Sequence, residues 1–183
     1  MIPTAPTENL EQLRFPIGRF DRSKPVSDSD VQQCLQELEM HPKLFRQALA
    51  GLTDAQLDTP YRPGGWTARQ VAHHLPESHM NAFIRIKLAL TEHQPTIKPY
   101  DENAWSALPD DLSGPVEISV ALQESLHRRW LLLLRQLTPT QLDRTFMHPE
   151  SGETSIRVAL SSYAWHGKHH VAHITALRQR MGW

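Results

Sequence analysis

Cysteine is nearly absent from this chain of 183 residues, because Cys34 is the only one. A lone cysteine excludes a disulfide within the chain and is typical of proteins that work in a reducing compartment. We therefore predict a cytoplasmic protein. Cys34 lies in an amphipathic helical pattern, where a packing role is favoured over a nucleophilic one.

Long apolar runs and a secretion signal are also missing. The segment Met1–Glu8 has neither a basic stretch nor an apolar core, so no signal peptide is evident. The longest apolar run, Trp130–Leu134, is far shorter than the roughly 20 residues that a membrane-spanning helix needs. These features predict a protein that does not enter a membrane.

The chain has little excess charge of either sign. Its 19 Lys and Arg against 20 Asp and Glu give a net charge of -1, and the basic residues are spread along the chain. A surface that binds nucleic acid normally carries a basic excess. We therefore expect a small-molecule substrate and no nucleic acid as the partner.

Strand signals are weak, and the apolar spacing is that of helices. Four long helices are expected: from Ser27 to about residue 50, interrupted at Pro42; from Thr67 to about residue 90, kinked at Pro76; over 116–137; and over 155–181. The prediction is an all-α fold, with residues 27–183 as one four-helix-bundle domain and residues 1–26 as a Pro-rich extended arm.

Two features concern the connections between these helices. Residues 91–114 form a long crossover between the second and third helices, and 146–154 resembles a hairpin. The segment 52–58 (LTDAQLD) is echoed at 137–143 (LTPTQLD), each copy after a long helix. A shared way of capping a turn explains this echo, and it also fits a bundle built from two helical pairs.

The most informative stretch is His166–His173, where histidines occupy four of the eight positions. His166 and His170 are four residues apart, so on a helix their imidazoles stack on one face and can grip one ion. The apolar stripe of this helix contains His170 and has His166 at its edge, whereas His169 lies outside it and His173 near its far edge. The pattern favours a metal site made by His166 and His170 over solvated histidines.

A third ligand is needed, because catalytic zinc has about three protein ligands and an open position. The second helix offers His73, His74 and His79. Helical phase puts His79 in the middle of the apolar stripe, His74 at its edge and His73 roughly opposite, and does not decide among them. No glutamate lies between His166 and His170, so the metalloprotease motif HExxH is absent.

Three motifs carry a family resemblance: YRPGGWTARQVAHHL at 61–75, KPYDENAW at 98–105 and WHGKHHVAHI at 165–174. They closely resemble the YfiT family of metal-dependent hydrolases, part of the DinB-like superfamily, over nearly the whole chain from about Phe15. The resemblance implies one metal per chain, bound by His74, His166 and His170, so His74 outranks His79. Zn²⁺ is expected, with Ni²⁺ or Mn²⁺ as alternatives.

The resemblance implies hydrolysis by an activated water. Related DinB-like proteins transfer low-molecular-weight thiols such as bacillithiol, so a metal-dependent thiol transferase is an alternative. A non-catalytic metal-binding stress protein, and an interaction module in which the histidines staple the helices, also stay open. The catalytic residues are unknown at this point; His79, His169, His173 and Tyr163 are candidates for supporting hydrogen bonds or proton transfer.

Homodimerisation is the remaining expectation. YfiT-like proteins are similar in being homodimers, and Trp105 and Trp165 lie outside the helical stripes, where aromatic residues suit an interface. The alternative is that both tryptophans cover the bundle beneath the long crossover.

Overall fold

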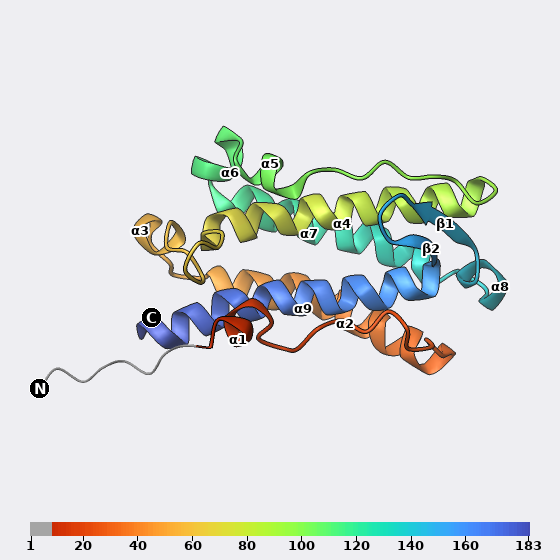
Figure 1. Cartoon of the computed structure of the whole chain (residues 1–183), viewed down its shortest axis with the longest axis horizontal. Helices are drawn as coiled ribbons and strands as arrows, with labels where there is room; N and C mark the ends of the chain where they lie inside the picture. The colour runs from red at the N-terminus through yellow and green to blue at the C-terminus, as the bar shows by residue number, and fades with distance from the viewer. Residues whose placement is uncertain (1–8) are drawn as a thin grey trace, which may run out of the picture.

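Four long helices dominate the computed structural model, which describes residues 9–183 (Figure 1). They are α2 (Asp28–Leu49), α4 (Ala68–Thr91), α7 (Val116–Leu134) and α9 (Ile156–Met181). The all-α four-helix prediction is confirmed. The third helix ends three residues earlier than predicted, because residues 135–137 form a turn.

Hydroxyl side chains begin two of these helices as the sequence predicts. Ser27 caps α2 and Thr67 caps α4, and in each case the side chain accepts from the backbone N–H three residues on. In turn, the side chains of Asp30 and Gln70 accept hydrogen bonds from the backbone N–H groups of Ser27 and Thr67, respectively, which completes a reciprocal capping box at each helix. These caps satisfy backbone donors that the first helical turn leaves without partners.

The prediction that the first long helix is interrupted at Pro42 is wrong. Helix α2 continues through Pro42, and α4 runs unbroken through Pro76. A proline lacks the N–H that would bond to the carbonyl four residues earlier, here that of Leu38. The Leu38 carbonyl instead accepts a 2.7 Å hydrogen bond from His127 Nδ1 on α7. The neighbouring helix therefore replaces the lost bond.

The helices pack in a ring in which α2 contacts α7 and α9, and α4 contacts the same two helices. The beginnings of α4 and α7 lie together, since Arg69 donates to the Gly114 carbonyl just before α7. The ends of α2 and α9 also meet, where Arg178 donates to the carbonyls of Ala48 and Ala50. Helices α4 and α7 are thus parallel, which requires the long crossover between them (Figure 1).

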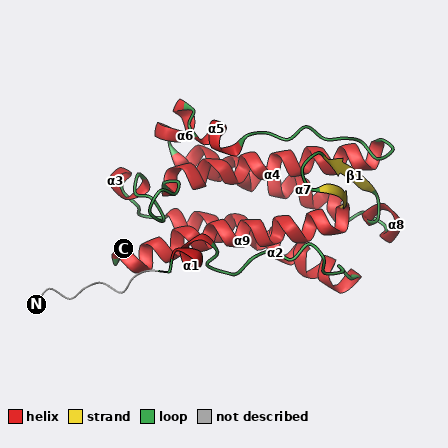
Figure 2. Ribbon diagram, in the orientation of Figure 1, coloured by secondary structure: helices red, strands yellow, loops and turns green. Residues whose placement is uncertain are grey.

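The crossover runs back along the bundle and carries two short helices, α5 (Glu102–Ser106) and α6 (Pro109–Ser113). The expected hairpin is present as β1 (Thr145–His148) and β2 (Gly152–Ser155), an antiparallel pair shown in yellow in Figure 2. Met147 bonds through its backbone to Pro95 and Ile97. The hairpin therefore holds the start of the crossover.

The two echoed segments form matching structures, α3 (Asp54–Leu57) and α8 (Pro139–Leu142). Thr53 with Gln56, and Thr138 with Gln141, make the same reciprocal capping box. The repeat is therefore a shared capped turn after a long helix.

Two hydrophobic clusters fill the bundle. One, toward the hairpin, includes Leu38, Ile86 and Trp130, and the other, toward α3, includes Phe45 and Leu75. Between them the four helices supply a layer of buried polar side chains: His41, His74, His79, Gln123, His127 and His170. Because burying polar groups is costly unless they are paired, this layer marks the candidate functional site.

The N-terminal segment partly agrees with the predicted extended arm. Residues 1–8 of that arm lie outside the described residues, and α1 (Leu10–Arg14) is a short helix within it. Phe15 and Phe20 lie across α9, with ring centroids 5.8 Å from His169 and 5.9 Å from Trp165, respectively. Nothing tests the division into an arm and one domain, which stays a prediction. No helix among the described residues is long and apolar enough to cross a membrane.

Candidate metal centre

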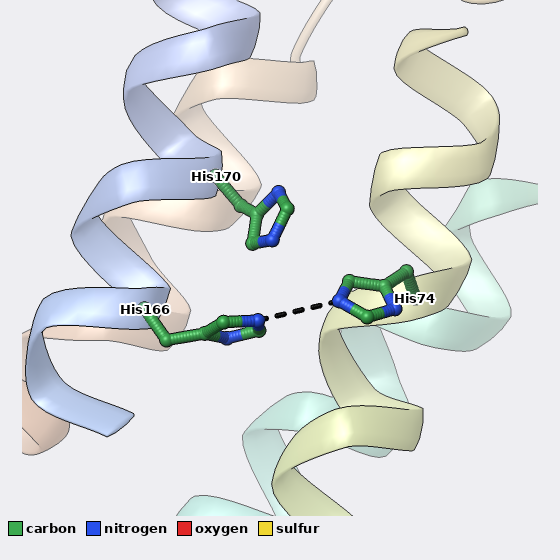
Figure 3. Close-up of side chains that lie close together, drawn as sticks. All are labelled: His74, His166 and His170. Carbon is green, nitrogen blue, oxygen red and sulfur yellow. Dashed lines mark hydrogen bonds between the residues drawn. The ribbon is translucent and has the colours of Figure 1, made fainter. Parts of the chain in front are cut away.

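His74, His166 and His170 converge between α4 and α9 (Figure 3). Each offers one ring nitrogen, and these three atoms lie within 4.8 Å of one another. His166 and His170 share one face of α9 because they are four residues apart, and their ring centroids are 4.5 Å apart. His74 reaches them from the facing helix.

His74 and His170 are buried and His166 is half-buried, and a lowered pKa favours the neutral form of each ring. Burial lowers the pKa of His74 to about 4. Burial, reinforced by the neighbouring histidines, holds the pKa of His166 and of His170 well below the ordinary value. A neutral imidazole has a lone pair for a metal, so burial keeps all three in the ligating form.

The donor arrangement fits a divalent ion. The Nε2 atoms of His74 and His166 are 3.3 Å apart, and two nitrogens bound tetrahedrally at about 2.05 Å would be about 3.3 Å apart. The Nδ1 atoms of His74 and His170 are buried without a hydrogen-bond partner in residues 9–183. A cluster of three neutral imidazoles suits borderline metals such as zinc or nickel better than hard oxygen-seeking ions.

His79, the other candidate from α4, lies beside this group and belongs to a different contact. Its Nε2 is 3.3 Å from His166 Nδ1, the nitrogen that does not face His74. Its Nδ1 is 2.8 Å from His127 Nε2. His79 is fully buried, which explains its position in the middle of the apolar stripe, but it supports the group without belonging to it.

The remaining candidates on these helices are covered by other parts of the chain. His73 donates from Nε2 to the Gly114 carbonyl and accepts from Ser119. His169 is only 7% exposed, because Trp165 stacks on it at 4.4 Å and the arm covers it. Helical phase places His169 outside the apolar stripe, and the arm explains why it is buried nevertheless.

His173 is likewise covered, and it binds the arm. Its Nε2 donates to the Arg14 carbonyl, and its ring stacks on Tyr61 at a centroid distance of 3.9 Å. Lys168, by contrast, points away from the cluster and pairs with Glu37 at 2.7 Å. Of the histidine-rich stretch, only His166 and His170 therefore join His74.

Sequence reasoning missed His41, Gln123 and His127. All three are at most 4% exposed, and Gln123 Nε2 lies 2.8 Å from His127 Nε2 and 3.3 Å from His41 Nδ1. Gln123 and His127 are four residues apart, one turn of α7, which was a signal for a shared buried face. His41 precedes Pro42, and its isolation in the sequence gave no comparable signal.

A cavity of about 460 Å³ opens onto the three histidines. Tyr163 lies in its wall and accepts a 3.1 Å hydrogen bond from Arg85 Nη1, whereas Arg85 Nε is buried and has no partner in the part of the chain that the structure describes. Arg14 and Arg62 also line the cavity. None of these three arginines forms an ion pair with a carboxylate among the described residues.

Two carboxylates, Glu102 and Glu150, line the same cavity and are the acidic side chains available there as a base. A second acidic group, Glu77 with Asp110 and Asp111, lies elsewhere on α4 and α6 and does not line the cavity. Burial raises the pKa of Glu77 to about 7, and the two aspartates add to that effect.

Comparison with known proteins agrees with this geometry. The DinB superfamily profile matches residues 37–174, which include all three clustered histidines. The chain belongs to the DinB superfamily. Within it, a Bacillus cereus protein provisionally named a metal-dependent hydrolase is 52% identical over 174 residues, covering 95% of this chain and all of that relative. A Bacillus mycoides protein with a similar name is 51% identical over the same length.

Two solved structures resemble this chain. YfiT from Bacillus subtilis, described as a probable metal-dependent hydrolase with an unusual four-helix bundle topology, aligns with a TM-score of 0.91 at 49% identity, over 94% of this chain and 99% of that one. The four-helix bundle TT2238 aligns with a TM-score of 0.55 at 23% identity, over 80% of this chain and 98% of that one, and shows the shared fold alone.

Proposed function

We propose that this DinB-superfamily protein is a metal-dependent hydrolase whose single divalent ion is held by His74, His166 and His170. The 3.3 Å separation of the His74 and His166 Nε2 atoms carries the proposal, because it matches two ligands of one tetrahedral ion. The hydrolase names of relatives about half identical in sequence support it. Zinc is the proposed ion, with nickel or manganese as alternatives.

When bound, such an ion supplies Lewis acidity and lowers the pKa of a water or thiol bound to it. The protein side chains provide the rest. Burial keeps the three imidazoles neutral, and the cavity admits a small molecule to them. Glu102 and Glu150, at the cavity wall, are the proposed candidates for accepting the proton that the nucleophile loses.

Arg85 suggests the chemistry of the substrate. Its Nε has no hydrogen-bond partner within residues 9–183, and its Nη1 donates to Tyr163, whose ring centroid lies 5.9 Å from that of His166. A guanidinium in this position suits a substrate with a carboxylate or phosphate group. We expect Arg85→Gln to raise KM for such a substrate by roughly 10- to 100-fold, because charge-assisted hydrogen bonds contribute about 1.5–3 kcal/mol, and to leave metal content unchanged.

Metal-dependent thiol transfer is the second candidate. Within residues 9–183, no cysteine lines the cavity, and Ser78, which does, makes no hydrogen bond with a histidine. This favours a bound water or a second substrate as the nucleophile, and a bound thiol would serve as well.

Turnover by the metal-free and metal-loaded protein tests these proposals. A panel of carboxylate-bearing esters and amides is measured alone, and a panel of electrophiles is measured with a small thiol. Metal-restored hydrolysis without thiol supports the hydrolase, whereas turnover only with thiol supports the transferase. A tightly bound ion with no turnover in either panel would leave a metal-binding protein without catalysis and contradict the proposal.

A further inference from the structure

A chain of hydrogen bonds leads from the Leu38 carbonyl to His166. It passes through His127 and His79, which are both fully or nearly fully buried, and ends at the half-buried His166. Pro42 is its origin, because the proline leaves the Leu38 carbonyl without a helical partner.

The donor and the acceptor of each hydrogen bond in this chain follow from the Leu38 carbonyl at its start. A carbonyl only accepts, so His127 Nδ1 carries the proton of the 2.7 Å bond to Leu38. Burial lowers the pKa of His127 to about 4, so the ring is neutral and its Nε2 accepts. His79 Nδ1, 2.8 Å away, must then donate.

The same reasoning reaches the metal centre. His79 is fully buried, and its hydrogen-bond partners among residues 9–183 are histidines, with no carboxylate to compensate a charge; its ring is therefore neutral, and its Nε2 accepts. His166 Nδ1, 3.3 Å from it, therefore carries a proton. This leaves the lone pair of His166 on Nε2, the nitrogen that lies 3.3 Å from His74 Nε2.

The orientation of the Gln123 amide is compatible with this assignment. Its side-chain nitrogen lies 2.8 Å from His127 Nε2 and 3.3 Å from His41 Nδ1, and an amide NH₂ has one hydrogen for each. In this orientation Gln123 presents a donor to His127 Nε2, as His79 does, while its own Oε1 is buried without a hydrogen-bond partner in residues 9–183.

We infer that His79 and His127 are positioning residues that lock His166 in the tautomer whose Nε2 can bind the metal. Hydrogen bonds from an outer residue commonly fix the tautomer and orientation of a metal-binding histidine. Here the residues behind the metal-binding histidine are themselves histidines, and the Leu38 carbonyl decides which nitrogen of each ring carries the proton. This inference rests on the proposed metal centre and adds residues from α2 and α7 to it.

Metal affinity and the tautomer of His166 test the inference without any activity assay. His79→Phe keeps a ring and removes both bonds, and should weaken zinc binding roughly 10- to 100-fold in competition with a chelator. His79→Gln retains a donor and an acceptor, and should recover part of that loss. His73→Phe is the matched control, because His73 is buried on the same helix and bonds to Ser119 and Gly114 instead; its zinc affinity should change by less than about threefold on the same scale.

His127→Phe should also weaken zinc binding. The double variant with His79→Phe should lose no more than His79→Phe alone, because both act through one chain. Nitrogen NMR of the metal-free parent protein should show the His166 proton on Nδ1. A proton on Nε2, or unchanged zinc affinity in a folded His79→Phe variant, would overturn the inference. Because the NMR reading needs no metal, it remains decisive even if the parent chain binds no ion.

Discussion

The Nε2 atoms of His74 and His166 face each other at 3.3 Å across the bundle, although the residues are 92 positions apart in the chain. Two lone pairs at this distance repel unless a proton or a cation lies between them. Helices α4 and α9 pack against each other, and the helical phase of α9 turns His166 toward α4. In the metal-free protein a proton on His74 Nε2 can occupy this position as a hydrogen bond to His166, and in the proposed metal centre the ion takes its place.

Acid should destabilise the metal-free protein. Burial holds the pKa of His74 and of His127 at about 4, whereas an unfolded histidine has a pKa of about 6.5. Between these values the unfolded chain binds more protons, so the free energy of unfolding falls as pH drops. Each residue contributes up to about 1.4 kcal/mol per pH unit.

Urea unfolding of the metal-free protein at pH 7, 6 and 5 measures this effect. Glu77 opposes it, because burial raises the pKa of this carboxyl to about 7 and the folded chain then gains a proton there on acidification. The fall in stability should therefore be steeper in Glu77→Gln. Equal stability at pH 7 and pH 5 in both proteins would show that the histidines are not buried as neutral rings.

Gly167→Ala should destabilise the protein despite the higher helix propensity of alanine. Gly167 lies in α9 against the His41 ring, and an added Cβ would overlap the Cδ2 and Nε2 atoms of that ring. His41 is 4% exposed and cannot move freely. We expect a loss of about 1–3 kcal/mol, typical of overpacking, measured by denaturant unfolding. A gain in stability would mean that His41 has room to shift.

The rate of the proposed reaction should rise with pH through roughly 6 to 8 and depend on the metal supplied, since the nucleophile must lose a proton. Cys34→Ser should leave the rate within about twofold, because the thiol lies outside the cavity and burial raises its pKa. A rate that depends on Cys34 and survives chelation would indicate a cysteine enzyme instead.

A homodimer remains a prediction. The two tryptophans that suggested it pack against aromatic side chains of the same chain. Trp165 stacks on His169 and contacts Phe20, and the ring centroids of Trp105 and Tyr100 are 4.4 Å apart. Sedimentation should give about twice the 20.9 kDa chain mass if the prediction is correct. A concentration-independent mass near that of one chain would reject it.

The sequence predicts the bundle well because local signals agree with it. Ser27 and Thr67 cap the helices where hydroxyl side chains precede apolar periodicity. The phase of α9 selects His166 and His170 correctly as neighbours. Pro42 was misread as an interruption, because a sequence pattern cannot show that His127, on another helix, bonds to the carbonyl that proline leaves free.

The choice between His74 and His79 shows the same limit. Both point inward from α4, His79 from the middle of the apolar stripe and His74 from its edge, and phase alone does not decide between them. Only tertiary packing decides that His74 faces His170, with ring centroids 4.9 Å apart, while His79 faces His127. The family resemblance, unlike the phase, points to the histidine that joins the cluster. The supporting residues on α2 and α7 could be recognised only once the packing of the whole bundle was known.

Metal stoichiometry in single-histidine variants tests the central claim most directly. The parent chain should bind one zinc ion, and His74→Ala, His166→Ala and His170→Ala should each lose it in elemental analysis after dialysis. His169→Ala, on the same helix and similarly buried, is the control and should retain the ion. Full metal retention by any of the three ligand variants, with folding verified by circular dichroism, would contradict the proposed metal centre.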